Sequence, residues 1–254
     1  MLADATSRSE SVTSLVQGEP LLSGCDRSLP RHEPLVMARD LSRKVARDHW
    51  LIRGVSLDIH PGDRLAITGP TGSGKTVLLR AIALLDPLDE GLIRYRGAPI
   101  DGESIPGYRK QVIYLHQRPA LFRGSVADNL RRPFGLQIHQ GKHFDRERTL
   151  GVLEVLGRGA SFLDQSSRDL SGGEAQIVAL LRAIQLDPSV LLLDEPSASL
   201  DQAAGQAIEG LIGRWLEEDS DARAFVWISH DPQRVSRVAT RRLAMRCGQL
   251  GPEA

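Results

Sequence analysis

The sequence predicts an α/β fold with a mostly parallel central sheet. Short apolar stretches alternate with stretches of helical periodicity along most of the chain, and this alternation is typical of parallel strands joined by helices. A glycine-rich loop, residues 69–76, separates one of these strands from a helix. Another strand ends in two carboxylates, Asp194 and Glu195. Because ligands of open α/β sheets bind at the carboxyl ends of the strands, we expect the functional site there.

The individual elements follow from the spacing of apolar residues. Predicted strands cover 35–41, 49–59, 64–68, 91–97, 111–116, 189–193, 224–228 and 242–246, and predicted helices cover 77–85, 146–156, 174–186 and 203–216, with one more beginning over 126–130. The first two strands precede the glycine-rich loop, and we expect them to form an N-terminal antiparallel β subdomain. From about 119 to 185 the pattern is helices with polar joints, which predicts an inserted helical subdomain.

The first 34 residues differ in composition from the rest of the chain. They are rich in Ser, Gly, Pro and charged residues and show no periodicity, which is typical of disorder. We therefore expect a disordered N-terminal tail at 1–34 and a folded domain at 35–254.

The bulk composition excludes several classes of protein. Lys plus Arg and Asp plus Glu both total 32, and the resulting net charge of zero argues against a broad nucleic-acid-binding face, so no nucleic-acid partner is expected. No apolar run approaches the roughly 18 residues that span a bilayer, so a role at a membrane needs a separate partner chain. The 2 cysteines are too few for a disulfide framework, which favours a reducing compartment.

The glycine-rich loop has the sequence of a phosphate-binding loop. Gly69-Pro-Thr-Gly-Ser-Gly-Lys-Thr76 matches the pattern G-x-x-x-x-G-K-[ST] at every fixed position, and its flanking strand and helix give the motif its required context, so we predict a P-loop NTPase core. Glycines let backbone N–H groups approach phosphate oxygens, and the helix N-terminus adds its dipole. Lys75 supplies a charge for the outer phosphates, and the Thr76 hydroxyl suits Mg²⁺. The predicted nucleotide-binding residues in this loop are Gly69, Pro70, Thr71, Gly72, Ser73, Gly74, Lys75 and Thr76.

The two carboxylates follow the apolar stretch 190–193. We expect Asp194 to hold the magnesium shell and Glu195 to act as general base toward an attacking water. Apolar residues followed by Asp-Glu are often only a strand that ends in solvent. The phosphate loop upstream makes the catalytic interpretation the stronger one.

The stretch Leu170-Ser-Gly-Gly-Glu174 precedes a predicted helix. Ser171, Gly172 and Gly173 would form an anion site from backbone N–H groups, a hydroxyl and the helix dipole. Ser171 with Glu174 three residues later is also a capping box. The two roles are compatible, and a cap alone does not need the double glycine.

With LSGGE between a phosphate loop and the stretch LLLDEP, the sequence resembles the nucleotide-binding subunit of an ATP-binding cassette (ABC) transporter. The resemblance covers roughly residues 35–250. It implies an ATPase that binds ATP and Mg²⁺. Gln117 matches a residue that contacts magnesium and water and senses the membrane partner, and His230 matches a switch histidine that contacts the γ-phosphate. The catalytic set that the resemblance implies is Lys75, Gln117, Glu195 and His230, and the metal set is Thr76, Gln117 and Asp194.

The resemblance also implies partners. Each ATP would lie between the phosphate loop of one subunit and the LSGGE of another in a head-to-tail homodimer that closes on ATP binding and opens on hydrolysis. Residues 198–201 match the loop that crosses the dimer interface. The helical region and the loop 117–134 would receive a separate transmembrane permease subunit. The chain would then lie peripherally on the cytoplasmic face of the inner (plasma) membrane.

One position departs from the family pattern. The family places an aromatic residue for adenine ahead of the phosphate loop, where this sequence has Ala46. Trp50 and His49 are near but belong to the second predicted strand. Stacking of a base on an aromatic ring contributes about 1–3 kcal/mol, so base preference and affinity are open.

The sequence is least specific about which solute is transported. The stretches 119–122, 126–130 and 133–134 resemble the ATPases of a two-component metal (iron) exporter family, and also phosphate importers. A rival is an ABC ATPase that does mechanical or regulatory work at the membrane, as in cell division. DNA-repair members would need a coiled-coil insertion for which the interval 76–170 is too short, and ribosome-acting members usually have two cassettes in one chain.

Overall fold

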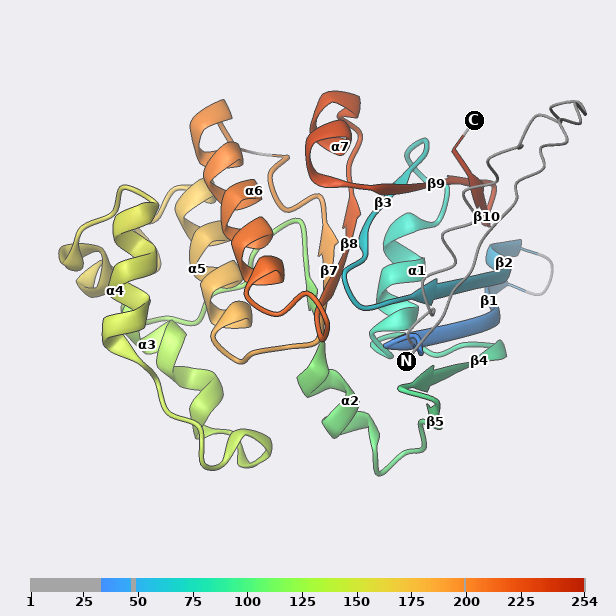
Figure 1. Cartoon of the computed structure of the whole chain (residues 1–254), viewed down its shortest axis with the longest axis horizontal. Helices are drawn as coiled ribbons and strands as arrows, with labels where there is room; N and C mark the ends of the chain where they lie inside the picture. The colour runs from blue at the N-terminus through green and yellow to red at the C-terminus, as the bar shows by residue number, and fades with distance from the viewer. Residues whose placement is uncertain (1–32, 47–48, 199, 254) are drawn as a thin grey trace, which may run out of the picture. The chain divides into compact units, whose positions relative to one another are not determined.

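The computed structural model describes residues 33–46, 49–198 and 200–253. These residues form two β-sheets and the helices that pack on them (Figure 1). The predicted disordered tail at 1–34 lies almost entirely outside the described residues. Its disorder, and the domain boundaries drawn from it, therefore stay predictions.

The larger sheet has six strands in the order β10-β9-β3-β8-β7-β6. All neighbouring pairs are parallel except β10 and β9, which are antiparallel. The mostly parallel central sheet is therefore confirmed, and the phosphate loop leaves its β3 strand. The strands are β3 (Arg64–Thr68), β6 (Val112–Leu115), β7 (Val190–Asp194), β8 (Ala224–Ile228), β9 (Arg241–Arg246) and β10 (Gln249–Pro252).

The smaller sheet is antiparallel and has the order β2-β1-β4-β5. It consists of β1 (Val36–Ala46), β2 (His49–Ile59), β4 (Glu90–Tyr95) and β5 (Ala98–Pro99). The antiparallel β subdomain is confirmed, and it also includes two strands that follow the phosphate loop in the chain.

The helices are mostly those that the apolar spacing predicts. They are α1 (Lys75–Ile82), α2 (Ile105–Gln111), α3 (Val126–Arg131), α4 (Arg146–Val155), α5 (Gly172–Ile184), α6 (Gln202–Glu217) and α7 (Pro232–Val238), with the 3-10 turns η1 (Arg132–Gly135), η2 (Gln137–His139) and η3 (Ala160–Asp164). The sequence did not predict α2, α7, β5 or β10. These four elements have 7 residues or fewer and contain Pro or Gly at positions that weaken a periodic signal.

The core has two parts, one on each face of the central sheet. On β7, Leu191 and Leu193 belong to the cluster that includes α5 and α6, whereas Val190 and Leu192 belong to the cluster that includes α1. Figure 1 shows α5 and α6 on one side of β7 and β8 and α1 on the other. Because side chains alternate along a strand, β7 is held from both faces, and this fixes the place where its two carboxylates emerge.

Among the described residues, no helix combines the length and the apolar character that crossing a membrane requires.

Candidate active site

The candidate site lies at the carboxyl edge of the central sheet. The phosphate loop follows β3, Asp194 ends β7, and His230 comes two residues after β8. These three strands are neighbours in the order β3-β8-β7. The sheet topology therefore brings three segments of the sequence to one place.

Glycine is required at two positions of the phosphate loop. Gly69 and Gly74 have φ values of 136° and 104°, which favour glycine over any other residue. A Cβ on Gly69 would lie 2.2 Å from the carbonyl oxygen of Met245, and one on Gly74 would lie 2.6 Å from that of Leu51. The loop is therefore packed tightly against β9 and β2, which holds its backbone in place.

Lys75 is held inside the loop by the loop's own backbone. Its side chain is buried, and its Nζ donates hydrogen bonds to the carbonyl oxygens of Gly69 at 2.8 Å and Pro70 at 2.9 Å. Burial lowers the pKa of the ammonium group, and the nearby carboxylates of Glu195 and Asp194 oppose that shift. Phosphate oxygens can replace these two carbonyl oxygens, because oxygens of both kinds accept hydrogen bonds from the ammonium group.

The Asp194 carboxylate joins the phosphate loop to two strands. Its Oδ2 accepts a hydrogen bond of 2.9 Å from the Thr76 hydroxyl and one of 2.8 Å from the Tyr114 hydroxyl of β6. Asp194 is 4% exposed. Oxygen donors from Thr76 and Asp194 thus lie side by side, which fits the preference of Mg²⁺ for oxygen ligands.

Glu195 connects two of the other predicted catalytic residues. Its Oε2 accepts a hydrogen bond of 3.0 Å from Gln117 Nε2, and its Oε1 lies 2.8 Å from His230 Nε2. Gln117 is thus tied to Glu195, and no described hydrogen bond joins it to Thr76 or Asp194. Glu195 has a φ of 48°, a rare conformation for a residue other than glycine, of the kind that clusters at active sites. This backbone turn directs Glu195 away from the line of β7.

A polar cavity of about 370 Å³ lies beside Glu195 and His230. Two buried groups in its wall, the Ser197 hydroxyl and the Trp227 indole N–H, have no hydrogen-bond partner among the described residues. Buried polar groups are usually satisfied, by ordered water if not by protein. The cavity therefore has both the volume and the polar groups to hold water next to Glu195.

The environment of residues 171–173 differs from that of the phosphate loop. Ser171 caps α5 with a complete capping box: its N–H donates to Glu174 Oε2 at 2.9 Å, and its Oγ accepts from Glu174 N at 3.3 Å. The bond from the Ser171 N–H first, and then a 2.8 Å bond that the Ser171 hydroxyl donates to Glu174 Oε2, lower the pKa of Glu174. Close packing explains the glycine at position 173, since a Cβ there would lie 2.9 Å from the Leu200 side chain. Gly172 faces open space.

The structure does not bring these three residues to the phosphate loop of the same chain. Ser171 and Gly172 are exposed, and among the described residues no hydrogen bond or ion pair connects 171–173 with 69–76. One chain therefore presents the phosphate loop and the LSGGE stretch as separate features.

The residues considered for adenine contact lie at the end of β1 and the start of β2. Ala46 is the last residue of β1, and His49 and Trp50 belong to β2. Trp50 pairs with Lys44, whose Nζ lies 4.1 Å from the centre of the indole ring. Trp50 therefore already has a cation on its ring.

Tyr114 is the site residue that sequence reasoning missed. It lies in the predicted strand 111–116, and its neighbours Ile113 and Leu115 are apolar. A hydroxyl in an otherwise apolar strand next to the one that ends in Asp194 was a usable signal, because a polar group placed there needs a partner.

Comparison with known proteins gives consistent matches. The family model described as ABC transporter matches residues 52–198. STAR1 of Oryza sativa subsp. japonica is 37% identical over 207 residues, which are 81% of this chain and 58% of STAR1. The probable iron export ATP-binding protein FetA of Escherichia coli (strain K12) is 31% identical over 208 residues, 82% of this chain and 90% of FetA. The sulfate/thiosulfate import protein CysA of Brucella melitensis biotype 1 is 35% identical over 207 residues, 78% of this chain and 55% of CysA.

The fold also matches a solved structure. The ATP-binding cassette MJ0796, described as a dimeric post-hydrolysis state bound to ADP and Pi, aligns with a TM-score of 0.73 and 25% identity, over 85% of this chain and 96% of that one. The present chain therefore spans little more than half of STAR1 and CysA but nearly all of FetA and of this cassette.

Proposed function

This chain belongs to the ABC transporter family and carries its ATP-binding ATPase domain, and on that basis we propose that it is the ATP-hydrolysing subunit of a transporter whose membrane-spanning part is a separate chain. The observation that supports this most directly is the cluster at the carboxyl edge of the sheet. There Lys75, Thr76 and Asp194 lie beside Glu195 and its two partners.

In this proposal ATP binds with its phosphates on the loop 69–76. Lys75 exchanges its bonds to Gly69 and Pro70 for phosphate oxygens. Thr76 and Asp194 would hold Mg²⁺, and Gln117 would reach it after leaving Glu195. A bound Mg²⁺ would neutralise charge on the β- and γ-phosphates. The changes at Lys75 and Gln117 both replace hydrogen bonds within the chain by bonds to the nucleotide or its cation. The arrangement of the site would therefore depend on bound nucleotide.

Hydrolysis needs a base, a water and a group that holds the γ-phosphate. Glu195 is the proposed base and takes a proton from water in the adjoining polar cavity. His230 is the proposed γ-phosphate contact and would move from Glu195 toward the phosphate. Their 2.8 Å contact would then be exchanged when ATP binds.

The second half of each site would come from another copy of the chain. Ser171, Gly172 and Gly173 form a largely exposed helix N-terminus, and among the described residues no hydrogen bond or ion pair joins it to the phosphate loop of its own chain. Such a terminus favours an anion. We propose a homodimer in which each LSGGE closes on the ATP of its partner.

We further propose that the chain works peripherally at the cytoplasmic face of the inner (plasma) membrane and that its cargo is a metal ion moved outward. FetA supports this cargo because the chain spans 90% of its length. The match to CysA, of which it spans 55%, covers only a part of that protein.

The test is ATP hydrolysis by the purified chain with Mg²⁺, with EDTA, and with the candidate permease encoded beside it in proteoliposomes. We expect activity that EDTA abolishes and that the permease with an iron salt stimulates. Mg²⁺-dependent activity without any solute movement would favour the cell-division alternative. Absence of hydrolysis under all these conditions would contradict the proposal.

A further inference from the structure

A largely buried arginine, Arg234, lies beside the proposed catalytic pair. It is in the first turn of α7, four residues after His230, and its side chain is 15% exposed. It lines the polar cavity that Glu195 and His230 also line. Because an isolated charge is costly to bury, a guanidinium in this position needs partners that hold it.

Three parts of the chain meet at the Arg234 guanidinium. Its Nε donates a hydrogen bond of 3.0 Å to Glu209 Oε1 of α6, and its Nη1 donates one of 3.3 Å to the carbonyl oxygen of Ser197. The group also lies against α6 one turn before Glu209, where a Cβ on Gly205 would be 3.4 Å from Nη2. The Arg234 side chain thus joins α7, α6 and the loop between β7 and α6.

The Glu209 carboxylate orients Arg234 and also binds a second arginine. Arg237 donates to it from Nε and Nη2, each at 3.1 Å. Charge-assisted bonds to a carboxylate are strong and directional, so Glu209 restricts where the Arg234 guanidinium can lie. Arg237 is more exposed, at 46%, it does not line the catalytic cavity, and no described hydrogen bond joins it to Ser197. The two arginines therefore share a carboxylate, but Arg234 is the one that is bonded to the loop.

The Ser197 carbonyl belongs to the turn that sets the direction of Glu195. In this turn the Ala198 N–H donates to the Glu195 carbonyl at 3.2 Å, and Glu195 has its φ of 48°. Such a rare conformation persists only where the surrounding structure holds it. The Glu195 N–H donates to the Ile228 carbonyl of β8 at 3.2 Å, which holds the start of the turn. The bond from Arg234 to Ser197 holds its end.

The segment that contains Arg234 also contains His230. Asp231 caps α7, since its Oδ1 accepts hydrogen bonds from the N–H groups of Gln233 at 2.9 Å and Arg234 at 3.2 Å. His230 is therefore joined directly to a capped helix start. Glu195 Oε1 lies 2.8 Å from His230 Nε2. The Arg234 side chain thus ties the segment of one predicted catalytic residue to the segment of the other.

We propose that Arg234 is a positioning residue for ATP hydrolysis, which keeps Glu195 and His230 in the relative placement that the reaction needs. It acts through the Ser197 carbonyl, and Glu209 in turn fixes its guanidinium. Because a misplacement of about 1 Å can cost about 100-fold in rate, loss of this tie should slow the chemical step and leave ATP binding intact. The inference rests on the proposed function, in which Glu195 is the base.

The test is steady-state ATP hydrolysis with Mg²⁺ by the full chain, comparing wild type with Arg234→Gln and Arg234→Lys. Glutamine removes the charge, and lysine keeps it but lacks the planar fork that bonds to two acceptors in different directions. We expect kcat to fall about tenfold or more in Arg234→Gln and several-fold in Arg234→Lys. The KM for ATP and the Kd of a fluorescent ATP analogue should stay within about twofold of wild type. A residue that only stabilises the fold would lower the melting temperature without this split between kcat and KM.

Arg237→Gln is the matched control, because it removes the other arginine bound to Glu209 and leaves the bond to the Ser197 carbonyl in place. Its kcat should equal that of wild type. Glu209→Ala should lower kcat as Arg234→Gln does. The double variant should be no slower than Arg234→Gln alone, since two residues that act through one contact are not additive.

Wild-type kcat in both Arg234 variants, an equal loss of kcat in Arg237→Gln, or a loss confined to KM would overturn the inference. If circular dichroism shows that Arg234→Gln does not fold, Arg234→Lys and Glu209→Ala decide the same question. A wild-type chain that does not hydrolyse ATP would contradict the proposed function and the inference together. A wild-type chain that hydrolyses ATP no faster than its Arg234 variants would contradict the inference alone, so the two failures are distinguishable.

Discussion

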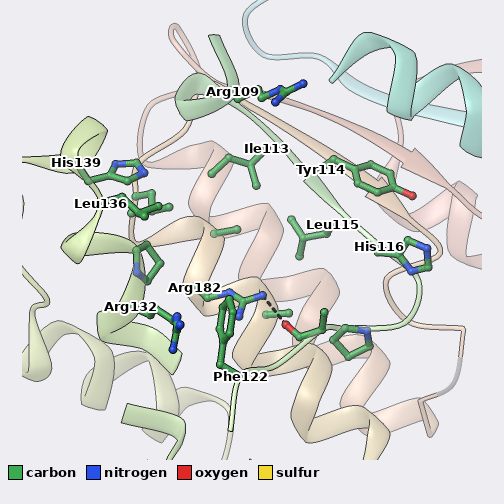
Figure 2. Close-up of a pocket in the computed structure, with 16 residues that line it drawn as sticks. Arg109, Ile113, Tyr114, Leu115, His116, Phe122, Arg132, Leu136, His139 and Arg182 are labelled. Carbon is green, nitrogen blue, oxygen red and sulfur yellow. Dashed lines mark hydrogen bonds between the residues drawn. The ribbon is translucent and has the colours of Figure 1, made fainter. Parts of the chain in front are cut away.

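The carboxyl edge of the central sheet and an apolar groove between β6 and α5 both contain charged side chains but pair them differently. At the sheet edge, Lys75 bonds to two loop carbonyls, Asp194 to two hydroxyls, and Glu195 to an amide and an imidazole. In the groove, Arg109, Arg132 and Arg182 line an apolar surface on which no residue is acidic (Figure 2). The charges at the sheet edge are paired within the chain, whereas those of the groove are not paired with any described carboxylate.

That difference indicates what each region needs from outside. Since the charges at the sheet edge are satisfied by bonds within the chain, a ligand there must replace existing bonds, as the phosphates and cation of ATP can. The groove has positive charge without a counterpart among its lining residues. Substitutions at the edge should therefore alter ATP chemistry, and substitutions in the groove should leave it unchanged.

The strongest test of this separation is Lys75→Ala. The substitution removes the only cation that the loop itself supplies to the phosphates, so we expect ATP hydrolysis to fall by more than about 100-fold. A steady-state phosphate-release assay, with circular dichroism as a check on folding, measures this. Arg182→Gln, in the groove, should leave hydrolysis unchanged, and a loss of hydrolysis in both variants would break the separation.

Tyr114→Phe tests a residue that acts through Asp194. Loss of the 2.8 Å bond from the Tyr114 hydroxyl leaves Asp194 less well oriented, and loss of such a supporting group typically costs about 10–100-fold in metal affinity or activity. We expect the Mg²⁺ concentration for half-maximal activity to rise by about tenfold at saturating ATP. Mn²⁺ binding to the ATP-loaded chain, followed by electron paramagnetic resonance, gives a readout besides activity. An unchanged affinity for both cations would show that Tyr114 is only structural.

Ala46→Tyr tests the adenine end. If an aromatic partner for the base is missing, the new ring should tighten ATP binding by about fivefold or more, the effect of at least about 1 kcal/mol of stacking. Ala46→Leu is the matched control, since it adds bulk without a ring face. Titration with a fluorescent ATP analogue compares the three chains. Equal affinity of the Tyr variant and the wild type would mean that another residue already contacts the base.

Asp86→Asn should leave ATP hydrolysis nearly unchanged and reduce stability by about 1–3 kcal/mol at neutral pH, because it weakens charge-assisted bonds to Arg80 and Arg43. Arg80 first, and Arg43 after it, lower the pKa of Asp86 from 3.8 to about 2. A depressed pKa in the folded state gives stability that is present above pH 3.8 and is lost as the pH falls toward 2.

Urea unfolding at a series of pH values measures this contribution. The difference in unfolding free energy between wild type and Asp86→Asn should be constant above about pH 5 and should shrink below about pH 4. A difference that persists at pH 2 would show that the Asp86 charge is not its source.

Much of the fold and most of the predicted site residues could be read from the sequence because they occur in contiguous stretches. The phosphate loop, the paired carboxylates and the LSGGE stretch each contain their own spacing, and the buried strand β7 has no competing periodicity. The contacts between these stretches could not be predicted from the sequence. The bonds from Tyr114 to Asp194 and from Gln117 to Glu195 depend on strand order, which periodicity does not encode.

The sequence also did not predict the local backbone geometry or the short elements. Nothing in the letters Asp-Glu-Pro indicates a φ of 48° at Glu195, since only the surrounding structure can hold that conformation. The helix α2 contains Pro106 and Gly107 in its first turn, and both residues lower helix propensity. The roles of the predicted site residues, as opposed to their positions, stay predictions.

The central claim is that one chain holds half of each ATP site and a second copy supplies the rest. The most direct measurement is size-exclusion chromatography with light scattering on Glu195→Gln, which should bind ATP without hydrolysing it. The same substitution combined with Gly172→Arg, at a position open to a side chain, should block LSGGE from the partner's ATP without disturbing the fold. We predict an ATP-dependent dimer for Glu195→Gln and a monomer that still binds ATP for the double variant. Turnover near the wild-type rate, or an ATP-loaded Glu195→Gln that stays monomeric, would contradict the claim.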